Sequence, residues 1–345
     1  MLKMNDDVKV LDVHGHVSMP LGAMAWLTML LGSNTALDSP FAANPDGIVN
    51  PAQGGVAEAE FHAATARHIA YIDERQIDVQ LIGPRPFIMF GWMAEHLIPA
   101  AALYVNDVIH QQVMTEPSRF VGACQLPQLA HAEDTTHCLA ELNRCVGDLG
   151  FGAAYVSPDP EGRRTSPGLD DSYWRPLYQR CVELDVPIVV HGSNMIDPRI
   201  ANIPHNYQIG FIVEQYIATQ LLSHGDVFDR YPDLRVIVCH CGGALDRFIP
   251  SDPHLSQRDL SANLFFDTCA HDVIYLEAAI KQRTPTRMVF GSEAPGSGGA
   301  RRPETGRTAD DLVPVIKSLE FLTDEEKVGI FNTNPARVVP ALGRI

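Results

Sequence analysis

Eight short apolar runs, spread along the whole chain, constrain its fold more than any other feature. Each run is rich in Val, Ile or Phe and about as long as one β-strand, and most are separated by stretches long enough for a helix. The predicted strands cover residues 8–13, 79–82, 120–125, 151–156, 187–190, 236–239, 264–267 and 288–290. Continuous apolar runs are typical of strands that are buried on both faces of a parallel sheet.

The alternation of these runs with helical patterns predicts an α/β fold. Residues 171–184 and 210–231 have the amphipathic pattern of helices that cover such a sheet. Eight strands alternating with helices favour a (β/α)8 TIM-like barrel, and 345 residues suit one such domain spanning 1–345. A doubly wound open sheet is the rival, but no Gly-rich dinucleotide turn follows the first strand.

Two connections are longer than a barrel needs. Residues 17–57 are dense in Gly, Pro, Asn and Ser, and we interpret them as a loop or lid over the end of the first strand. Within them, the apolar stretch 19–32 is a candidate for an interface or for a wall of the pocket. The second insertion follows the fifth strand, between His191 and Gly210. In a barrel both would stand on the catalytic face.

Charge and composition exclude several classes of protein. The formal charge of −16 and the scattered basic residues argue against a nucleic-acid partner. The N-terminal MLKMNDDVKV lacks the layout of a secretory signal, and the stretch 19–32 is too short and interrupted to span a bilayer. Seven cysteines without a CxxC pair indicate free buried thiols. We therefore expect a cytoplasmic protein that binds no membrane.

The segment LDVHGHV places two histidines at the end of the first apolar run. Because alternate residues of a strand point to the same side, His14 and His16 form a chelate for a divalent cation. Three further candidates stand at equivalent places: His191 ends VPIVVH, His240 ends VIVCH, and Glu293 follows MVFGS. The ends of barrel strands converge at one mouth, so these groups are expected to meet there.

Imidazoles together with a carboxylate are the ligand set of a catalytic zinc or related ion. The alternative is that each histidine simply satisfies a local partner at its strand end. A soft-ligand cluster at Cys239, His240 and Cys241 is a competitor. Alternation opposes it, because Cys239 should face the helix layer if His240 faces the mouth. We interpret His62, His68 and His224 as surface or packing residues.

Candidate substrate contacts are less sharply defined. Arg85, in LIGPRPF, is held between two prolines, which suits bidentate binding of a carboxylate, although a surface arginine in a stiff turn fits equally well. Arg247 is a second carboxylate clamp or a salt-bridged helix residue. Tyr207 and His205, in the loop after His191, are further candidates.

With these residues in this order, the chain resembles the amidohydrolase superfamily, and more closely its branch that contains aminocarboxymuconate semialdehyde decarboxylase. The resemblance covers essentially the whole chain. It includes SPDPEGRRTSPGLDDSYWRPLYQRCVELDVPIVVHGS, HCGGA, FFDTC, GSEAPG and IFNTNPARVV. It implies a divalent metal, zinc first and manganese second, held by His14, His16, His191 and Glu293. His240 would polarise or protonate the substrate.

Glu293 stands where most decarboxylases of this branch carry Asp. The substitution resembles 4-oxalomesaconate hydratase and the carbon–carbon hydrolase of a meta-cleavage product. GPRPF, YWRPLY and GSEAPG lean toward the hydrolase. We therefore expect a metal-dependent hydrolase that cleaves a C–C bond of a carboxylated ring-fission product in aromatic catabolism. The alternatives are a 4-oxalomesaconate-type hydratase and a non-oxidative decarboxylase of an aromatic acid.

The resemblance also implies that Arg85 and Arg247 hold the carboxylates of a small anionic, aromatic-derived substrate, and that the protein is a homodimer or higher homo-oligomer. One departure concerns HCGGALDRF, which is about one helical turn shorter than usual. Because a helix that loses one turn keeps its face, Arg247 is still expected to point inward. A different class of protein, a non-catalytic metal-binding scaffold or sensor, predicts a closed ligand shell and no turnover.

Overall fold

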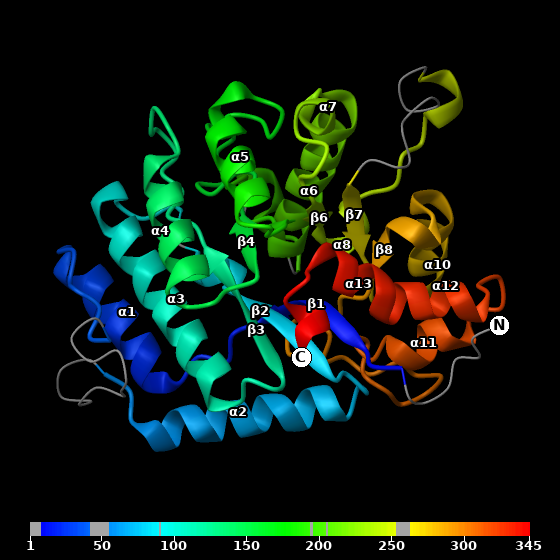
Figure 1. The fold of residues 1–345 in the computed structure, drawn as a ribbon, viewed down its shortest axis with the longest axis horizontal. Coiled ribbons are helices and arrows are strands. Elements are labelled where there is room, and N and C mark those ends of the chain that lie inside the picture. The colour runs from blue at the N-terminus through cyan, green and yellow to red at the C-terminus, as the bar shows by residue number, and fades with distance from the viewer. Residues whose placement is uncertain (1–7, 42–54, 90, 194–195, 205, 253–262) are drawn as a thin grey trace.

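The computed structural model describes residues 8–41, 55–89, 91–193, 196–204, 206–252 and 263–345. In this part of the chain, eight parallel strands follow one another around a nearly closed barrel (Figure 1). They are β1 (Leu11–His16), β2 (Val79–Gly83), β3 (Phe120–Gln125), β4 (Ala153–Val156), β5 (Ile188–Val190), β6 (Val236–Val238), β7 (Leu264–Asp267) and β8 (Met288–Val289). The first and last strands meet where the Val13 N–H donates to the Phe290 carbonyl at 2.9 Å. The predicted (β/α)8 fold is confirmed.

Helices form the outer layer around these strands. They are α1 (Leu21–Ser33), α2 (Glu58–Asp73), α3 (Ile98–Thr115), α4 (Thr136–Gly147), α5 (Arg175–Glu183), α6 (Asn206–His224), α7 (Val227–Arg230), α8 (Cys239–Gly242), α10 (Val273–Arg283), α11 (Val313–Ser318), α12 (Asp324–Val328) and α13 (Asn334–Val338). The helix predicted over 171–184 is α5 with a short 3-10 turn before it, and the one over 210–231 is α6 followed by α7.

Two apolar layers stabilise the fold. One lies between the strands and the helices, and the other fills the barrel itself, where Leu11, Val121 and Val189 pack together. Val338 and Leu342, in and just after α13, join the inner layer and close the floor of the barrel. Full burial of one such side chain contributes about 1.5–3 kcal/mol.

The start of β1 differs from the prediction. The strand begins at Leu11 and runs to His16, so both histidines lie within it. Its register against β2 shifts between Asp12 and Gly15, where β1 has one more residue than its partner. Such a β-bulge interrupts strict alternation. As a result His14 and His16 point to the same side as Leu11 and Val13 below them.

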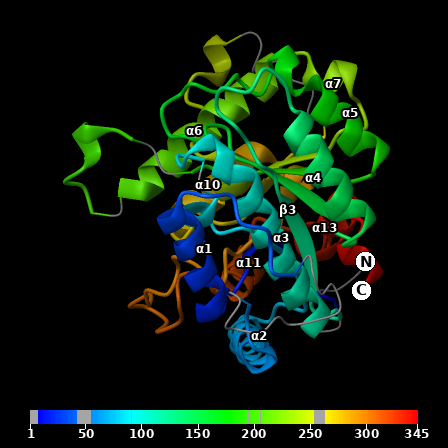
Figure 2. The ribbon, with the colours of Figure 1, turned by 90° about the vertical axis from the view of Figure 1, so that its left-hand side faces the viewer.

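The prediction of a loop over 17–57 is wrong for its first half, because α1 occupies 21–33. Ala23, Trp26, Leu27 and Leu30 form its buried stripe at helical spacing. Trp26 stacks on Tyr104 of α3, and α1 runs beside that helix (Figure 2). Leu21 and Met29, both exposed, obscured this stripe in the sequence. Residues 42–54 lie outside the described part.

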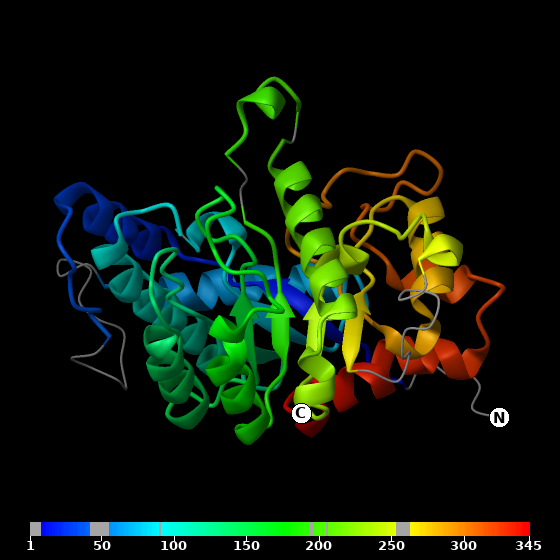
Figure 3. The same ribbon diagram turned by 90° about the horizontal axis from the view of Figure 1, so that it is seen from above.

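The insertion after β5 was predicted correctly as a long connection. Its described residues 196–204 project away from the barrel ahead of α6 (Figure 3). Among the described residues, no helix combines the length and apolar character needed to cross a membrane.

Candidate active site

Three buried imidazoles converge where β1 and β5 end. The ring of His14 lies 5.1 Å from that of His16 and 5.0 Å from that of His191, measured between centroids. Within the described residues, the Nε2 atoms of all three rings are buried and have no hydrogen-bond partner. Leaving a buried polar atom unpaired costs about 1–3 kcal/mol, so three together need an explanation.

Each of these rings is fixed through its other nitrogen. Nδ1 of His14 lies 2.6 Å from the Asp267 carboxylate, Nδ1 of His16 lies 2.9 Å from the Pro84 carbonyl, and Nδ1 of His191 lies 2.8 Å from the Gly192 carbonyl. Because each acceptor holds the proton on Nδ1, each Nε2 offers a lone pair. This is the second-sphere arrangement of metal-binding histidines.

Glu293 completes the cluster from the end of β8. Its N–H donates to the His14 carbonyl at 2.7 Å, which holds it beside β1. One ligand atom each from His14, His16, His191 and Glu293 lies within 4.8 Å of all the others. Oε2 of Glu293 accepts from Ser297 Oγ at 2.8 Å, while Oε1 of Glu293 lies 3.7 Å from His16 Nε2. Three neutral nitrogens and one carboxylate oxygen fit a divalent cation.

The protonation states of His16, His191 and Glu293 agree with this geometry, whereas Asp267 favours the protonated ring of His14, whose Nε2 proton a cation would have to displace. Burial lowers the pKa of His16 to about 4 and that of His191 well below its usual value, so both rings are neutral. Burial also acts to lower the pKa of His14, but the Asp267 carboxylate outweighs it and raises that pKa. For Glu293, burial favours the neutral acid, yet the nearby rings of His16 and His240, each 3.7 Å from Oε1, outweigh it and hold the pKa well below normal. Glu293 is therefore a carboxylate.

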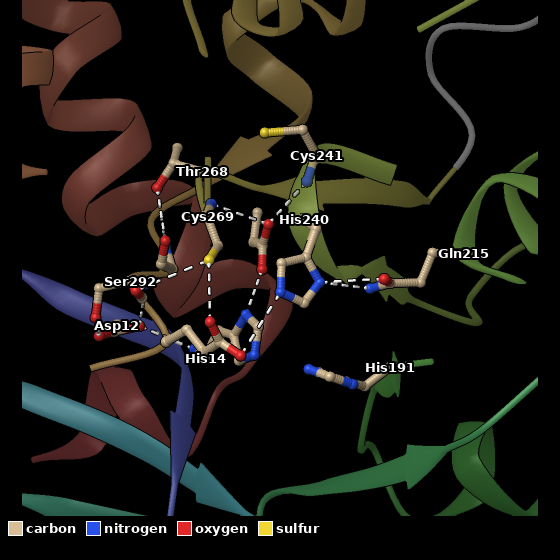
Figure 4. Close-up of polar contacts among 12 residues, drawn as sticks. Asp12, His14, His191, Gln215, His240, Cys241, Thr268, Cys269 and Ser292 are labelled. Atoms are coloured by element: carbon tan, nitrogen blue, oxygen red, sulfur yellow. Dashed lines mark hydrogen bonds and ion pairs between the residues drawn. The ribbon is translucent and has the colours of Figure 1, made fainter. Parts of the chain in front are cut away.

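His240 stands beside this cluster, just after β6. Its Nε2 lies 3.7 Å from Oε1 of Glu293, and its Nδ1 contacts the Gln215 side-chain amide of α6 at 2.9 Å from the nitrogen and 3.1 Å from the oxygen. Figure 4 shows His14, His191 and His240 around a common space, with Gln215 on the side of His240 away from His14. The amide can serve Nδ1 as donor or acceptor, so it orients the ring in either protonation state.

The backbone at this mouth is unusual. His240, Cys241 and Glu293 all adopt left-handed conformations, with φ of 52°, 58° and 59°. Such conformations cost a non-glycine residue about 1–3 kcal/mol and cluster at functional sites. Next to His240 and Glu293 opens a cavity of about 330 Å³. Its wall includes Phe211, Cys269, His271, Tyr275 and Ser297.

The predicted substrate contacts do not all reach this cavity. Arg85 is half-buried, donates from Nε to the Val17 carbonyl at 3.1 Å, and lines a second cavity of about 430 Å³ with Met19 and Pro295. The helix expected after His240 is absent: residues 243–248 form a loop, because the left-handed residues end α8. Arg247 is exposed on that loop. The side chain of Tyr207 and all of His205 lie outside the described residues.

The orientation predicted for Cys239 is wrong. Cys239 belongs to the apolar layer inside the barrel, whereas Cys241 packs in the outer layer. Alternation fails here because the two residues after Cys239 are left-handed. Both cysteines are nevertheless buried free thiols, as the composition indicated.

Sequence reasoning missed the residues that support the histidines. Asp267 is fully buried, holds His14, and also accepts from the Cys241 and Cys269 N–H groups at 3.0 and 3.1 Å. The sequence could have indicated Asp267, because this acidic residue ends an apolar run and thus resembles Glu293, which follows one closely. No sequence pattern indicated Gln215 or Ser297 as site residues, because Gln215 lies within a helix and Ser297 lies in a loop.

Comparison with known proteins agrees with this geometry. An amidohydrolase family model matches residues 11–341. The chain therefore belongs to the amidohydrolase family, as its resemblance implied.

Its relatives come from the expected branch. The chain is 33% identical over 287 residues to 2-keto-4-carboxy-3-hexenedioate hydratase of Sphingobium sp., covering 80% of this chain and 82% of that one. It is 25% identical over 280 residues to 2-amino-3-carboxymuconate-6-semialdehyde decarboxylase of Dictyostelium discoideum, covering 76% and 73%. The crystal structure of 4-oxalomesaconate hydratase from Rhodopseudomonas palustris matches 97% of both chains with a TM-score of 0.79 at 26% identity.

Proposed function

We propose that this protein is a metal-dependent hydratase that adds water to the activated C=C bond of a small carboxylated substrate of the 4-oxalomesaconate type. The observation that carries the proposal is the set of three buried, unpartnered Nε2 atoms facing Glu293. Similarity to two hydratases over most of the chain supports the choice of reaction.

The expected C–C hydrolase has less support. The relatives named above are hydratases and a decarboxylase, and they favour the alternative reaction over the hydrolytic one. The residues that leaned toward the hydrolase, in GPRPF, YWRPLY and GSEAPG, are compatible with a hydratase. Because these reactions need the same metal and the same acid and base, the site residues keep their roles.

The proposed ligands are His14, His16, His191 and Glu293, and zinc is the proposed ion, with manganese as the alternative. A divalent cation held there supplies Lewis acidity, which lowers the pKa of water and polarises a substrate oxygen. The ligand set supports zinc, since imidazoles and one carboxylate are its ordinary partners. The cavity beside His240 and Glu293 could hold a substrate next to the proposed ligands, which supports catalysis rather than a scaffold role.

The protein's own residues handle the protons. Glu293, an ionised carboxylate, takes a proton from the attacking water while the new C–O bond forms at one alkene carbon. The electron pair of the C=C bond moves toward the conjugated carbonyl, and His240 Nε2 then gives a proton to the other alkene carbon. Glu293 would return its proton to His240 once their atoms, 3.7 Å apart, close to hydrogen-bond distance. Each turnover therefore consumes one water and leaves both residues unchanged.

We also propose that Arg85 binds a substrate carboxylate. Burial lowers the pKa of Arg85, and the negative charge of Glu293 partly offsets this effect. The guanidinium is therefore close enough to Glu293 for an electrostatic interaction. Arg247 and Tyr207 stay predictions as substrate contacts. The cytoplasmic location, the single-domain organisation and the homo-oligomeric state stay predictions too.

The test is turnover by the metal-loaded protein of 4-oxalomesaconate, a biphenyl-type ring-fission product and hydroxylated benzoates. We expect 4-oxalomesaconate to gain water, seen as loss of absorbance from its conjugated double bond. Protein treated with a chelator should lose this activity, and zinc should restore it. Release of CO2 from a benzoate, or cleavage of the ring-fission product, would replace the hydratase by the corresponding alternative.

A further inference from the structure

Cys269 and His271 follow β7 and lie on the cavity side of Glu293. The Cys269 Sγ lies 4.0 Å from Oε2 of Glu293 and 3.8 Å from the Ser292 carbonyl. One ligand atom each from Cys269, His271 and Glu293 lies within 4.8 Å of the other two. All three residues line the cavity beside His240, and Figure 4 shows the Cys269 sulfur on this side of the site.

The polar atoms of this group are poorly satisfied. In the described part of the chain, Nε2 of His271 is buried and has no hydrogen-bond partner. The Cys269 side chain is only 3% exposed, and its two contacts are long even for sulfur. A sulfur, a ring nitrogen and a carboxylate oxygen thus lie close together. The oxygen accepts from Ser297 Oγ at 2.8 Å, whereas no described residue donates to the ring nitrogen.

We propose that Cys269, His271 and Glu293 form a second cation site, with a soft sulfur, nitrogen and oxygen ligand set that takes zinc. These are the three ligand types that zinc prefers. Glu293 would be shared, because Oε1 faces the histidine cluster whereas Oε2 faces Cys269. When the ion binds, the Cys269 thiol loses its proton to solvent and the sulfur becomes a thiolate ligand.

A second ion would bind Oε2 of Glu293, the oxygen that Ser297 contacts. It would also fill part of the cavity beside His240. It would draw Glu293 away from proton transfer, so zinc in excess inhibits the enzyme. This consequence rests on the proposed role of Glu293, whereas the site itself does not. Since the first site contains no sulfur ligand, the two ions are distinguishable by spectroscopy.

Co²⁺ is the probe, because it substitutes for zinc and absorbs in the near ultraviolet when a thiolate binds it. The metal-free protein is titrated with Co²⁺ while bound metal is measured by equilibrium dialysis. We expect two equivalents to bind, with the sulfur-to-cobalt band appearing only with the second. Cys269→Ser and His271→Asn should each bind one equivalent and lack the band.

Cys138→Ser is the matched control, since Cys138 is a buried thiol of α4 whose sulfur contacts the Pro127 carbonyl in the loop after β3. It should keep both equivalents and the band, and thermal melting should show that all variants fold. Binding of a single equivalent by the wild type, or a band that persists in Cys269→Ser, would overturn the proposal. Failure of the hydratase proposal would instead leave the band and the stoichiometry intact while 4-oxalomesaconate stays unchanged.

Discussion

The two ends of the barrel interior are built on opposite principles. At the floor, Leu11, Val121, Val338 and Leu342 pack in an apolar layer between regular strands. At the mouth, three Nε2 atoms lie buried without a partner among the residues that the structure describes, and the backbone of Glu293 is left-handed. The floor therefore stabilises the fold, whereas the unpaired atoms and the left-handed backbone at the mouth reduce its stability. The packing that stabilises the barrel and the groups that can carry its chemistry therefore lie at opposite ends of the interior.

The largest expected effect comes from removing the charge of Glu293 at the mouth. Glu293→Gln keeps the shape but loses the proton acceptor and an anionic ligand, so kcat should fall by about a thousandfold. Steady-state kinetics measures the loss, and thermal melting shows that the fold is retained. Activity close to wild type would contradict the role of Glu293.

The floor should respond in the opposite way. Leu342→Ala leaves a void in the apolar layer, and we expect the free energy of unfolding to fall by about 3 kcal/mol. Urea denaturation measures this loss. Metal content and kcat per folded molecule should not change, because the side chain contacts no residue of the mouth cluster. A change in either would mean that floor and mouth are coupled.

Asp267 tests how the mouth is held together. In Asp267→Asn, the amide oxygen can still accept from the Cys241 and Cys269 N–H groups, but its NH2 then faces His14 Nδ1. That geometry moves the ring proton to Nε2 and blocks the lone pair. Metal affinity should fall about 10- to 100-fold, measured by competition with a chelator.

Asp107→Asn is the matched control for this change, since Asp107 is a buried carboxylate that contacts Ser39 and Arg144 far from the cluster. It should lower stability but leave metal affinity unchanged. Equal losses of affinity in both variants would mean that the effect of Asp267 is merely structural.

The smallest effect should come from Gln215, which holds His240 but contacts none of the proposed ligands. Gln215→Leu removes one hydrogen bond worth about 1 kcal/mol, so kcat should fall roughly 5- to 10-fold. Metal content should stay unchanged. A loss of metal together with activity would show that Gln215 supports the whole cluster rather than His240 alone.

Much of the fold was predictable, because it depends on local periodicity. The eight apolar runs coincide with the eight strands. Two runs match their strands at both ends, and no end is displaced by more than three residues. The failures have physical causes. The amphipathic stripe of α1 was hidden by exposed Leu21 and Met29, and the alternation used to orient Cys239 was broken by left-handed residues.

The candidate site was predictable to the extent that its residues end strands. His14 and His16 lie in the last part of β1, while His191, His240 and Glu293 follow strands by one to four residues, and any barrel brings strand ends together. Asp267 could have been found by the same rule. Gln215, Ser297 and the unpartnered Nε2 of His271 could not, because they reach the site from a helix and from loops whose paths depend on packing.

The sequence by itself determined the order of the strands, the types of residue at their ends and hence the chemistry that can occur at the mouth. These depend on spacing along the chain, which is a local property. Only the tertiary structure decided which nitrogen of each histidine is tied and which is free, because the ties come from Asp267, Pro84 and Gly192, in three separate segments. It also decided that the bulge in β1 turns His14 and His16 inward, since a register shift exists only between paired strands.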